Sequence, residues 1–149
     1  MDFDDDSYCI VCGEENPLSL NLEFKNVDNE NGQVKTEFIP GDELAGFKGV
    51  MHGGVISTLL DEAMAKAIYR QGWDALTAEM TVRYVEPVHL GERIRILGWI
   101  QDKRRRIIEA SSRMEDKLGD ELARAKARFV LRGSRRTNRA KTGEDENEN

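Results

Sequence analysis

The stretch that most constrains the fold is an apolar run from Val55 to Gln71. Apolar residues recur there at helical spacing, at positions 56, 59, 60, 63, 64, 67 and 68. They cover so much of the predicted helix that other structure must wrap around it. Gly72 follows as a helix terminator. Asp61 and Glu62 lie in the middle of this run, so each carboxylate must find a partner or face water.

Six extended runs are distributed around this helix in the sequence, and we expect each to form a strand. They cover residues 20–24, 34–39, 77–88, 93–101, 106–114 and 121–132. The last run has helix-favouring composition, but its alternation of small apolar and basic residues favours a strand. In the run 77–88, strict alternation puts Thr77 on the polar face with Glu79 and Thr81. An antiparallel sheet curled around one apolar helix fits this pattern, so the predicted class is α+β with the hotdog architecture.

The chain of 149 residues suits a single domain, which we place at residues 8–132. Residues 1–7 are mostly aspartate, and residues 133–149 contain no large apolar side chain. We expect both ends to be disordered, since they cannot bury enough apolar surface to order themselves.

Charge and hydropathy exclude several classes of partner. The formal net charge of -6 argues against general nucleic-acid binding. No apolar stretch approaches the roughly 20 residues that span a bilayer. The N-terminus lacks the basic and then apolar layout of a signal peptide. We therefore predict a cytoplasmic protein whose partners include neither nucleic acid nor membrane.

Both cysteines lie in one C-x-x-C motif, Cys9 and Cys12. Such a motif can supply half of a zinc site or a redox pair. The two histidines, His52 and His89, are far away in sequence, and His89 follows a proline turn where we expect it to be exposed. We expect the cysteines to be ordinary packed residues and predict no metal, with metal binding and redox chemistry as the alternatives.

The segment "HGGVISTLLDEAM" resembles the signature of the hotdog-fold acyl-CoA thioesterases, in the branch that includes the phenylacetate-pathway and hydroxybenzoyl-CoA enzymes. "CIVCGEENPLSLNLEF" and "ARFVL" extend this resemblance over residues 8–132. It implies hydrolysis of an acyl-CoA to a free acid and coenzyme A, with no cofactor beyond the coenzyme A of the substrate. It also implies self-association as a homodimer or a dimer of dimers.

The resemblance assigns catalytic roles to four residues. Gly53 would polarise the thioester carbonyl through its N–H, a contribution of about 3–4 kcal/mol. Asp61 would attack the carbonyl or activate a water, and Thr77 would help to hold that water. His52 would orient the loop. Gly53 opens the helix, where backbone N–H groups lack acceptors, whereas Asp61 lies roughly 12 Å further along the axis, which agrees with a site shared between two subunits.

Residues 103–106 form a basic cluster in this acidic chain. It forms either a solvated hairpin tip or a group of guanidinium side chains that recognises the phosphates of coenzyme A. The resemblance adds an aromatic strand residue, the end of the last strand and the second helix glycine. The predicted substrate-binding residues are Gly54, Tyr84, Lys103, Arg104, Arg105, Arg106 and Arg132.

One departure from the resemblance concerns the loop before His52. Several relatives carry an asparagine or glutamine there, but this chain has Ala45 and Gly46. Water positioning would then be altered or activity reduced, which keeps a non-catalytic acyl-CoA-binding or sensing protein open as the alternative. Hydratase or dehydratase chemistry is less well supported, since its histidine and acid motifs are missing.

Each single residue also has a structural interpretation. Asp61 would then be solvated, His52 a loop hydrogen-bonder and Thr77 a simple strand residue, and we expect Glu62 to be structural or exposed. An apolar acyl pocket is expected from Ile56, Leu60, Met80 and Val82.

Overall fold

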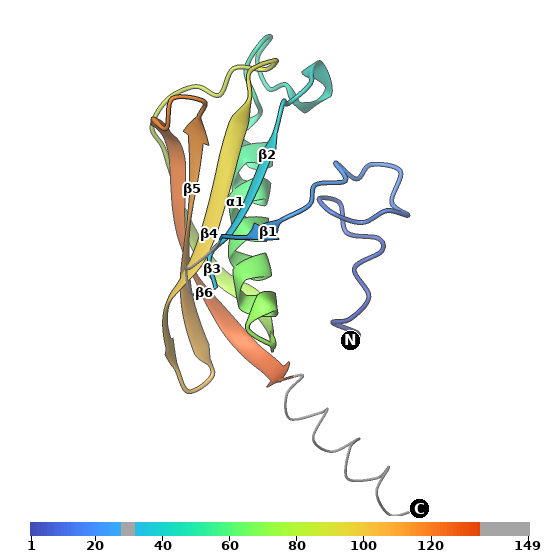
Figure 1. Ribbon diagram of the computed structural model, residues 1–149, viewed down its shortest axis with the longest axis vertical. Coiled ribbons are helices and arrows are strands. Elements are labelled where there is room, and N and C mark those ends of the chain that lie inside the picture. Colours follow the sequence, from blue (N-terminus) through green and yellow to red (C-terminus); the bar gives the residue numbers. More distant parts are fainter. Residues whose placement is uncertain (28–31, 135–149) are drawn as a thin grey trace, which may run out of the picture.

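A computed structural model describes residues 1–27 and 32–134 of the chain. One long helix packs against one face of a six-stranded antiparallel sheet (Figure 1), which confirms the predicted hotdog class. The helix is α1 (Gly53–Arg70), and the sheet order is β1-β2-β4-β5-β6-β3. The strands are β1 (Lys25–Asn26), β2 (Val34–Phe38), β3 (Trp73–Tyr84), β4 (Ile94–Arg104), β5 (Ile107–Asp116) and β6 (Glu121–Ser134). A short 3-10 turn, η1 (Asp42–Leu44), precedes the helix.

The predicted helix is confirmed, and so is the set of residues that it buries. The buried residues of α1 are Ile56, Leu59, Leu60, Ala63, Met64, Ala67 and Ile68, which are the apolar positions predicted to face the core. The helix begins at Gly53, two residues before the predicted start, because His52 caps it. Gly72 follows the last turn with φ +89°, a backbone conformation that suits glycine.

The sheet lies very close to the helix at Gly98 in β4. Gly98 pairs with Val34 on one side and Ser112 on the other. A Cβ at this position would overlap the backbone carbonyl of Ala63 in α1. The absence of a side chain therefore sets how near the sheet approaches the helix.

The predicted strand at residues 20–24 is wrong. The sheet begins only at Lys25, with a two-residue strand that pairs with β2. Leu22 and Phe24 are buried, which explains the alternation that indicated a strand. The backbone of this segment instead bonds to the N-terminal segment, where the N–H of Leu22 donates to the Val11 carbonyl at 3.0 Å. Asn21 has φ +52°, which breaks the extended path.

The alternation predicted for β3 is also wrong at one position. Thr77 pairs with Phe129 of β6, whereas Glu79 pairs with Arg128, so Ala78 is an extra residue in a β-bulge. Directly paired residues share a face of the sheet, and Phe129 is buried. The bulge therefore turns Thr77 to the helix side, away from the face that carries Glu79.

The final run forms β6, as its alternation predicted. Ala123, Ala125, Ala127 and Phe129 are buried, and the basic residues between them are exposed. The strand continues to Ser134, two residues beyond the predicted end of the domain.

The predicted disorder of residues 1–7 stays a prediction, and in the structure Asp6 lies 2.9 Å from Lys66 of α1. Residues 135–149 of the predicted tail, and residues 28–31 between the first two predicted strands, lie outside the described residues.

The sheet has a long edge strand, β3, and a basic turn between β4 and β5. β3 is 12 residues long and pairs with β6 alone, so it forms an edge of the sheet as far as the described residues extend. β4 and β5 are joined by a tight turn at Arg105 and Arg106, in which Arg105 has φ +55°. No helix in the described ranges is long and apolar enough to cross a membrane.

The close approach at Gly98 gives a test of the packing. Gly98→Ala should lower the free energy of unfolding by about 1–3 kcal/mol, because the new methyl group forces α1 away from the sheet. Gly133→Ala in β6 is the matched control, since its Cβ would meet only Asp74 at an ordinary 3.7 Å. Urea denaturation of both variants measures the difference. Equal stability of the two would contradict the proposed close contact.

Candidate active site

The centre of the candidate site is a hydrogen-bonded pair between α1 and β3. Thr77 Oγ1 donates to Asp61 Oδ1 at 2.7 Å. The two residues are brought together by the bulge at Ala78, which points Thr77 toward the helix. The structure thus joins two residues that were predicted separately, and it shows that Asp61 is neither freely solvated nor unpartnered.

The surroundings of Asp61 change its acidity. Partial burial raises the pKa of the Asp61 carboxyl above its ordinary value, and the Thr77 hydrogen bond lowers the pKa in part. A carboxylate in this setting is a stronger base than an exposed aspartate. Such a shift makes Asp61 suitable for proton abstraction from a water or for nucleophilic attack.

The start of α1 leaves one backbone donor unused. His52 Nδ1 accepts from the N–H of Gly54 at 2.8 Å, and the His52 carbonyl accepts from Val55 and Ile56 at 3.0 and 3.1 Å. No residue in the described part of the chain accepts from the N–H of Gly53. The helix dipole adds positive character at this end, so the Gly53 N–H is a ready donor for a substrate carbonyl.

His52, Gly53 and Gly54 are consecutive in the sequence, but they have different hydrogen-bonding roles at the start of α1. His52 is the N-cap, and a neutral His52 must carry its proton on Nε2 because Nδ1 accepts. Gly54 was predicted to contact substrate, but its N–H is already bonded to His52. Gly53 remains the residue whose N–H can bind substrate.

Tyr84, at the end of β3, lies against the same helix end. Its hydroxyl donates to the Gly53 carbonyl at 3.1 Å and is 2.5 Å from the Ser57 hydroxyl. Ser57 also donates to the Gly53 carbonyl, at 3.1 Å. Ser57 was not predicted, although its position one helical turn after Gly53 was a signal that it shares this face.

The predicted phosphate-binding residues gather at the β4–β5 turn. Lys103 lies 5.2 Å from the centre of the Trp73 ring, Arg104 pairs with Asp102 at 3.0 Å, and Arg106 donates to the Leu131 carbonyl at 3.1 Å. Within the described ranges, Arg105 and Arg132 are exposed and have no ion-pair partner. These two guanidinium groups are the ones free to bind an anion.

One chain does not bring all the predicted residues together. Tyr84 contacts the N-terminal end of α1, whereas Lys103 contacts Trp73 at the other end of β3. These strand positions are separated by roughly 35 Å at 3.3 Å per residue. The basic turn and Tyr84 therefore lie near opposite ends of β3 within a single subunit, and their predicted contacts with coenzyme A stay a prediction.

The loop before His52 is held by backbone contacts at Ala45 and Gly46. The N–H of Gly46 donates to the Val50 carbonyl at 3.0 Å, and Ala45 forms a bridge with Met51. A Cβ at Gly46 would lie 3.0 Å from the Cα of His52, which is tighter than most side-chain contacts. A larger residue at position 46 would therefore require His52 or the loop to shift.

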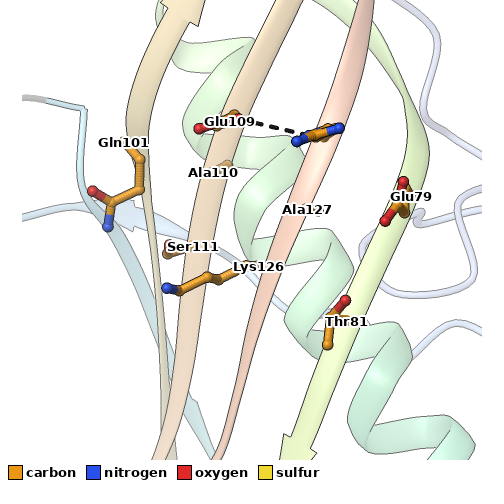
Figure 2. Close-up of a pocket in the computed structure, with 9 residues that line it drawn as sticks. Glu79, Thr81, Gln101, Glu109, Ala110, Ser111, Lys126 and Ala127 are labelled. Carbon is orange, nitrogen blue, oxygen red and sulfur yellow. Dashed lines mark ion pairs between the residues drawn. The ribbon is translucent and has the colours of Figure 1, made fainter.

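A hollow on the other face of the sheet is not part of this site. Figure 2 looks onto the sheet with α1 behind it and shows Glu79, Thr81 and Lys126 on the near side. Glu109 pairs there with Arg128 at 3.6 Å. None of the predicted site residues lines this hollow, which the sheet separates from Asp61.

The central segment of the chain matches a known protein family. The family model of the thioesterase superfamily matches residues 48–123, which contain α1, β3, β4 and β5. The chain belongs to the thioesterase superfamily. A provisionally named esterase of Archaeoglobus fulgidus is 30% identical over 73 residues, which are 49% of this chain and 47% of that protein. The chain thus spans less than half the length of the curated relatives it matches.

Solved structures of thioesterase superfamily proteins share the fold over most of the chain. One such protein is 25% identical with a TM-score of 0.74, covering 79% of this chain and 60% of that one. A protein of Streptococcus mutans, solved bound to acetyl-CoA, is 26% identical with a TM-score of 0.69 and covers 76% and 91%. The PaaI protein of E. coli, at 16% identity and a TM-score of 0.71, shows the same fold, with coverage of 78% and 83%.

The Thr77 hydrogen bond gives a test of the carboxylate environment. Thr77→Val should raise the pKa of Asp61 further, because it removes a donor that favours the charged form. Thr77→Ser keeps a hydroxyl and should return the pKa toward the wild-type value. Carboxyl chemical shifts followed by NMR across pH measure all three proteins. An Asp61 titration that is unchanged in Thr77→Val would mean that the hydrogen bond does not form.

Proposed function

We propose that this thioesterase superfamily member hydrolyses an acyl-CoA to a free acid and coenzyme A. The observation that carries the proposal is the Asp61 carboxylate, partly buried on α1 and hydrogen-bonded to Thr77 at 2.7 Å. The acetyl-CoA complex of the Streptococcus mutans protein supports a coenzyme A thioester as the ligand class. A coenzyme A complex is also known for a hypothetical thioesterase of Streptococcus pneumoniae.

A second feature of the pneumococcal protein supports the choice of residues. Its structure has also been solved with one aspartate or one threonine replaced by alanine. Those two positions are 16 residues apart, which is also the separation of Asp61 and Thr77. We take Asp61 as the base or nucleophile and Thr77 as the group that holds it and the attacking water.

In the proposed mechanism, the Gly53 N–H binds the thioester carbonyl oxygen and stabilises the negative charge that develops on it. Asp61 either removes a proton from a water that attacks the carbonyl carbon, or attacks that carbon itself and forms an acyl anhydride that water then hydrolyses to the free acid. The C–S bond breaks, and the coenzyme A thiolate leaves as the thiol after taking up a proton, from Asp61 in the first route and from solvent in the second. Arg105 and Arg132 are proposed to bind phosphates of the coenzyme.

The proposed site is shared between two copies of the chain. Gly53 and Asp61 are two helical turns apart, roughly 12 Å along α1, which is too far for both to act on one carbonyl. β3 offers an edge of 12 residues, and it carries both Thr77 and Tyr84. A long edge strand tends to pair with another strand. Pairing of two β3 edges would bring Gly53 of one subunit toward Asp61 of the other.

The proposed chemistry is tested by release of free thiol from short, medium, long and aromatic acyl-CoAs. Asp61→Asn should lower kcat by about 10²–10⁴-fold, because it removes the base but retains the oxygen that accepts from Thr77. Wild-type kcat/KM should fall as pH decreases, starting above the range typical of an exposed aspartate, since burial raises the Asp61 pKa. Exposed Asp42→Asn is the matched control.

The outcomes of that experiment separate the candidate functions. Tight binding of the intact thioester with no thiol release would favour the non-catalytic acyl-CoA-binding protein. Such a result would agree with the missing polar residue before His52. Thiol release that survives Asp61→Asn would reject Asp61 as the reacting group.

Sharing of the site is tested by mixing two inactive variants. Gly53→Pro removes the proposed carbonyl donor at the first helical position, which accommodates proline, and His52 already has extended φ and ψ of -60° and 134°. Gly53→Ala keeps the N–H, and its Cβ would meet Tyr84 at an ordinary 3.6 Å, so it is the matched control. Refolding Gly53→Pro together with Asp61→Asn should restore up to about a quarter of wild-type activity, because half of the dimers would then contain one intact site. No recovery would place Gly53 and Asp61 in the same subunit's site.

A further inference from the structure

The second carboxylate of the helix, Glu62, points to a different cluster from Asp61. Its Oε1 lies 3.8 Å from Cys9 Sγ and 3.5 Å from Cys12 Sγ. The three ligand atoms lie within 4.8 Å of one another, and all three residues are partly buried. This cluster of Cys9, Cys12 and Glu62, called here the thiol–carboxylate cluster, plays no part in the proposed hydrolysis.

The spacing of these atoms matches the edges of a coordination tetrahedron. Zinc binds thiolate sulfur at about 2.3 Å and carboxylate oxygen at about 2.0–2.2 Å, so sulfur and oxygen ligands around one ion are about 3.5–3.7 Å apart. The observed distances of 3.5 and 3.8 Å therefore suit one ion at the centre. Asp6 is not one of these ligands, because its Oδ2 approaches Cys12 Sγ at 3.7 Å but pairs with Lys66 Nζ at 2.9 Å, so a solvent molecule would complete the tetrahedron.

The loop that carries the cysteines is built tightly around the sulfur atoms. The N–H of Val11 donates to Cys9 Sγ at 3.4 Å, a contact that stabilises a thiolate. The N–H of Gly13 closes the turn on the Cys9 carbonyl at 2.9 Å. A Cβ at Gly13 would lie only 2.5 Å from the Cys9 nitrogen, so glycine is required for this path. Val11 itself is buried, which fixes the loop in place.

The electrostatics of the cluster favour a cation. Asp6 and Asp61 are acidic neighbours of the three ligand residues, and Glu14, Glu23, Lys66 and Arg70 line the same hollow as Cys12. Lys66 Nζ lies 2.9 Å from Asp6 and 3.8 Å from Glu62, so it offsets only part of this negative charge.

We propose that Cys9, Cys12 and Glu62 bind one Zn²⁺ ion that fastens the N-terminal segment to α1, with solvent as the fourth ligand. Two thiolates select zinc over the hard cations calcium and magnesium. The ion would tie residues 9–12 to the middle of the helix, on the side away from the sheet (Figure 1). The proposal takes up metal binding, the alternative to ordinary packed cysteines in the sequence analysis, and it does not depend on the proposed hydrolysis.

The site is tested with Co²⁺ as a spectroscopic substitute for zinc in the reduced, full-length protein. One equivalent should bind with the d–d bands of tetrahedral Co²⁺ and a sulfur-to-cobalt charge-transfer band, and Zn²⁺ should displace it. Because both thiols must ionise, about two protons should be released per ion bound. Absence of the charge-transfer band would overturn the proposal, as would octahedral Co²⁺ alone.

Variants assign the ligands. Cys12→Ser should abolish the charge-transfer spectrum, and Glu62→Gln should weaken Co²⁺ binding by more than about tenfold. Exposed Glu14→Gln, which removes the same charge beside the loop, is the matched control and should bind as the wild type does. Circular dichroism confirms that each variant is folded.

A measurement on the wild type alone guards against variants that do not fold. A chelator should lower the Tm of the zinc-loaded protein, and re-addition of Zn²⁺ should restore the Tm. A Tm that is unaffected by chelator and zinc would overturn the structural role. A Cys9–Cys12 disulfide that forms readily, together with no Co²⁺ binding after reduction, would identify a redox pair instead.

Discussion

Two adjacent carboxylates on a buried helix are the constraint on which the rest of the structure depends. Consecutive residues of a helix point about 100° apart, so Asp61 and Glu62 cannot share a partner. Asp61 faces β3 and is satisfied by Thr77, whereas Glu62 faces the N-terminal segment and contacts both cysteines. Each carboxylate has therefore required its own polar partner on a different side of an otherwise apolar helix.

The two partners are supplied by different devices of the backbone. On the sheet side, the bulge at Ala78 reverses the direction of one side chain and gives Asp61 a hydroxyl. On the opposite side, the tight turn at Gly13 presents two sulfur atoms to Glu62. Irregular backbone, the bulge and the turn, thus occurs where polar side chains contact the core helix. The regular strands hold that helix in place.

At the N-terminal end of α1, hydrogen-bond partners are also found for some backbone groups and not for others. His52 and its carbonyl accept from three of the first N–H groups, and none of the described residues accepts from the N–H of Gly53. The Tyr84 and Ser57 hydroxyls both donate to the carbonyl of the same residue. In the proposed mechanism this terminus binds the substrate carbonyl, and its distance of roughly 12 Å from Asp61 is the reason that the proposed site uses two chains.

The sequence by itself determined the helix, its core-facing residues and five of the six strands, since helical and strand periodicities are local properties of the chain. The roles of Gly53 and Asp61 were implied by the resemblance of their segment to the thioesterases, and they stay predictions. It could not locate β1, because the alternation of Leu22 and Phe24 arises from packing against the N-terminal segment rather than from a sheet. Only the tertiary structure decided that Thr77 faces the helix, that Gly54 is occupied by His52 and that Glu62 meets Cys9 and Cys12. These contacts depend on strand register and on chain segments 50 residues apart, which no local pattern records.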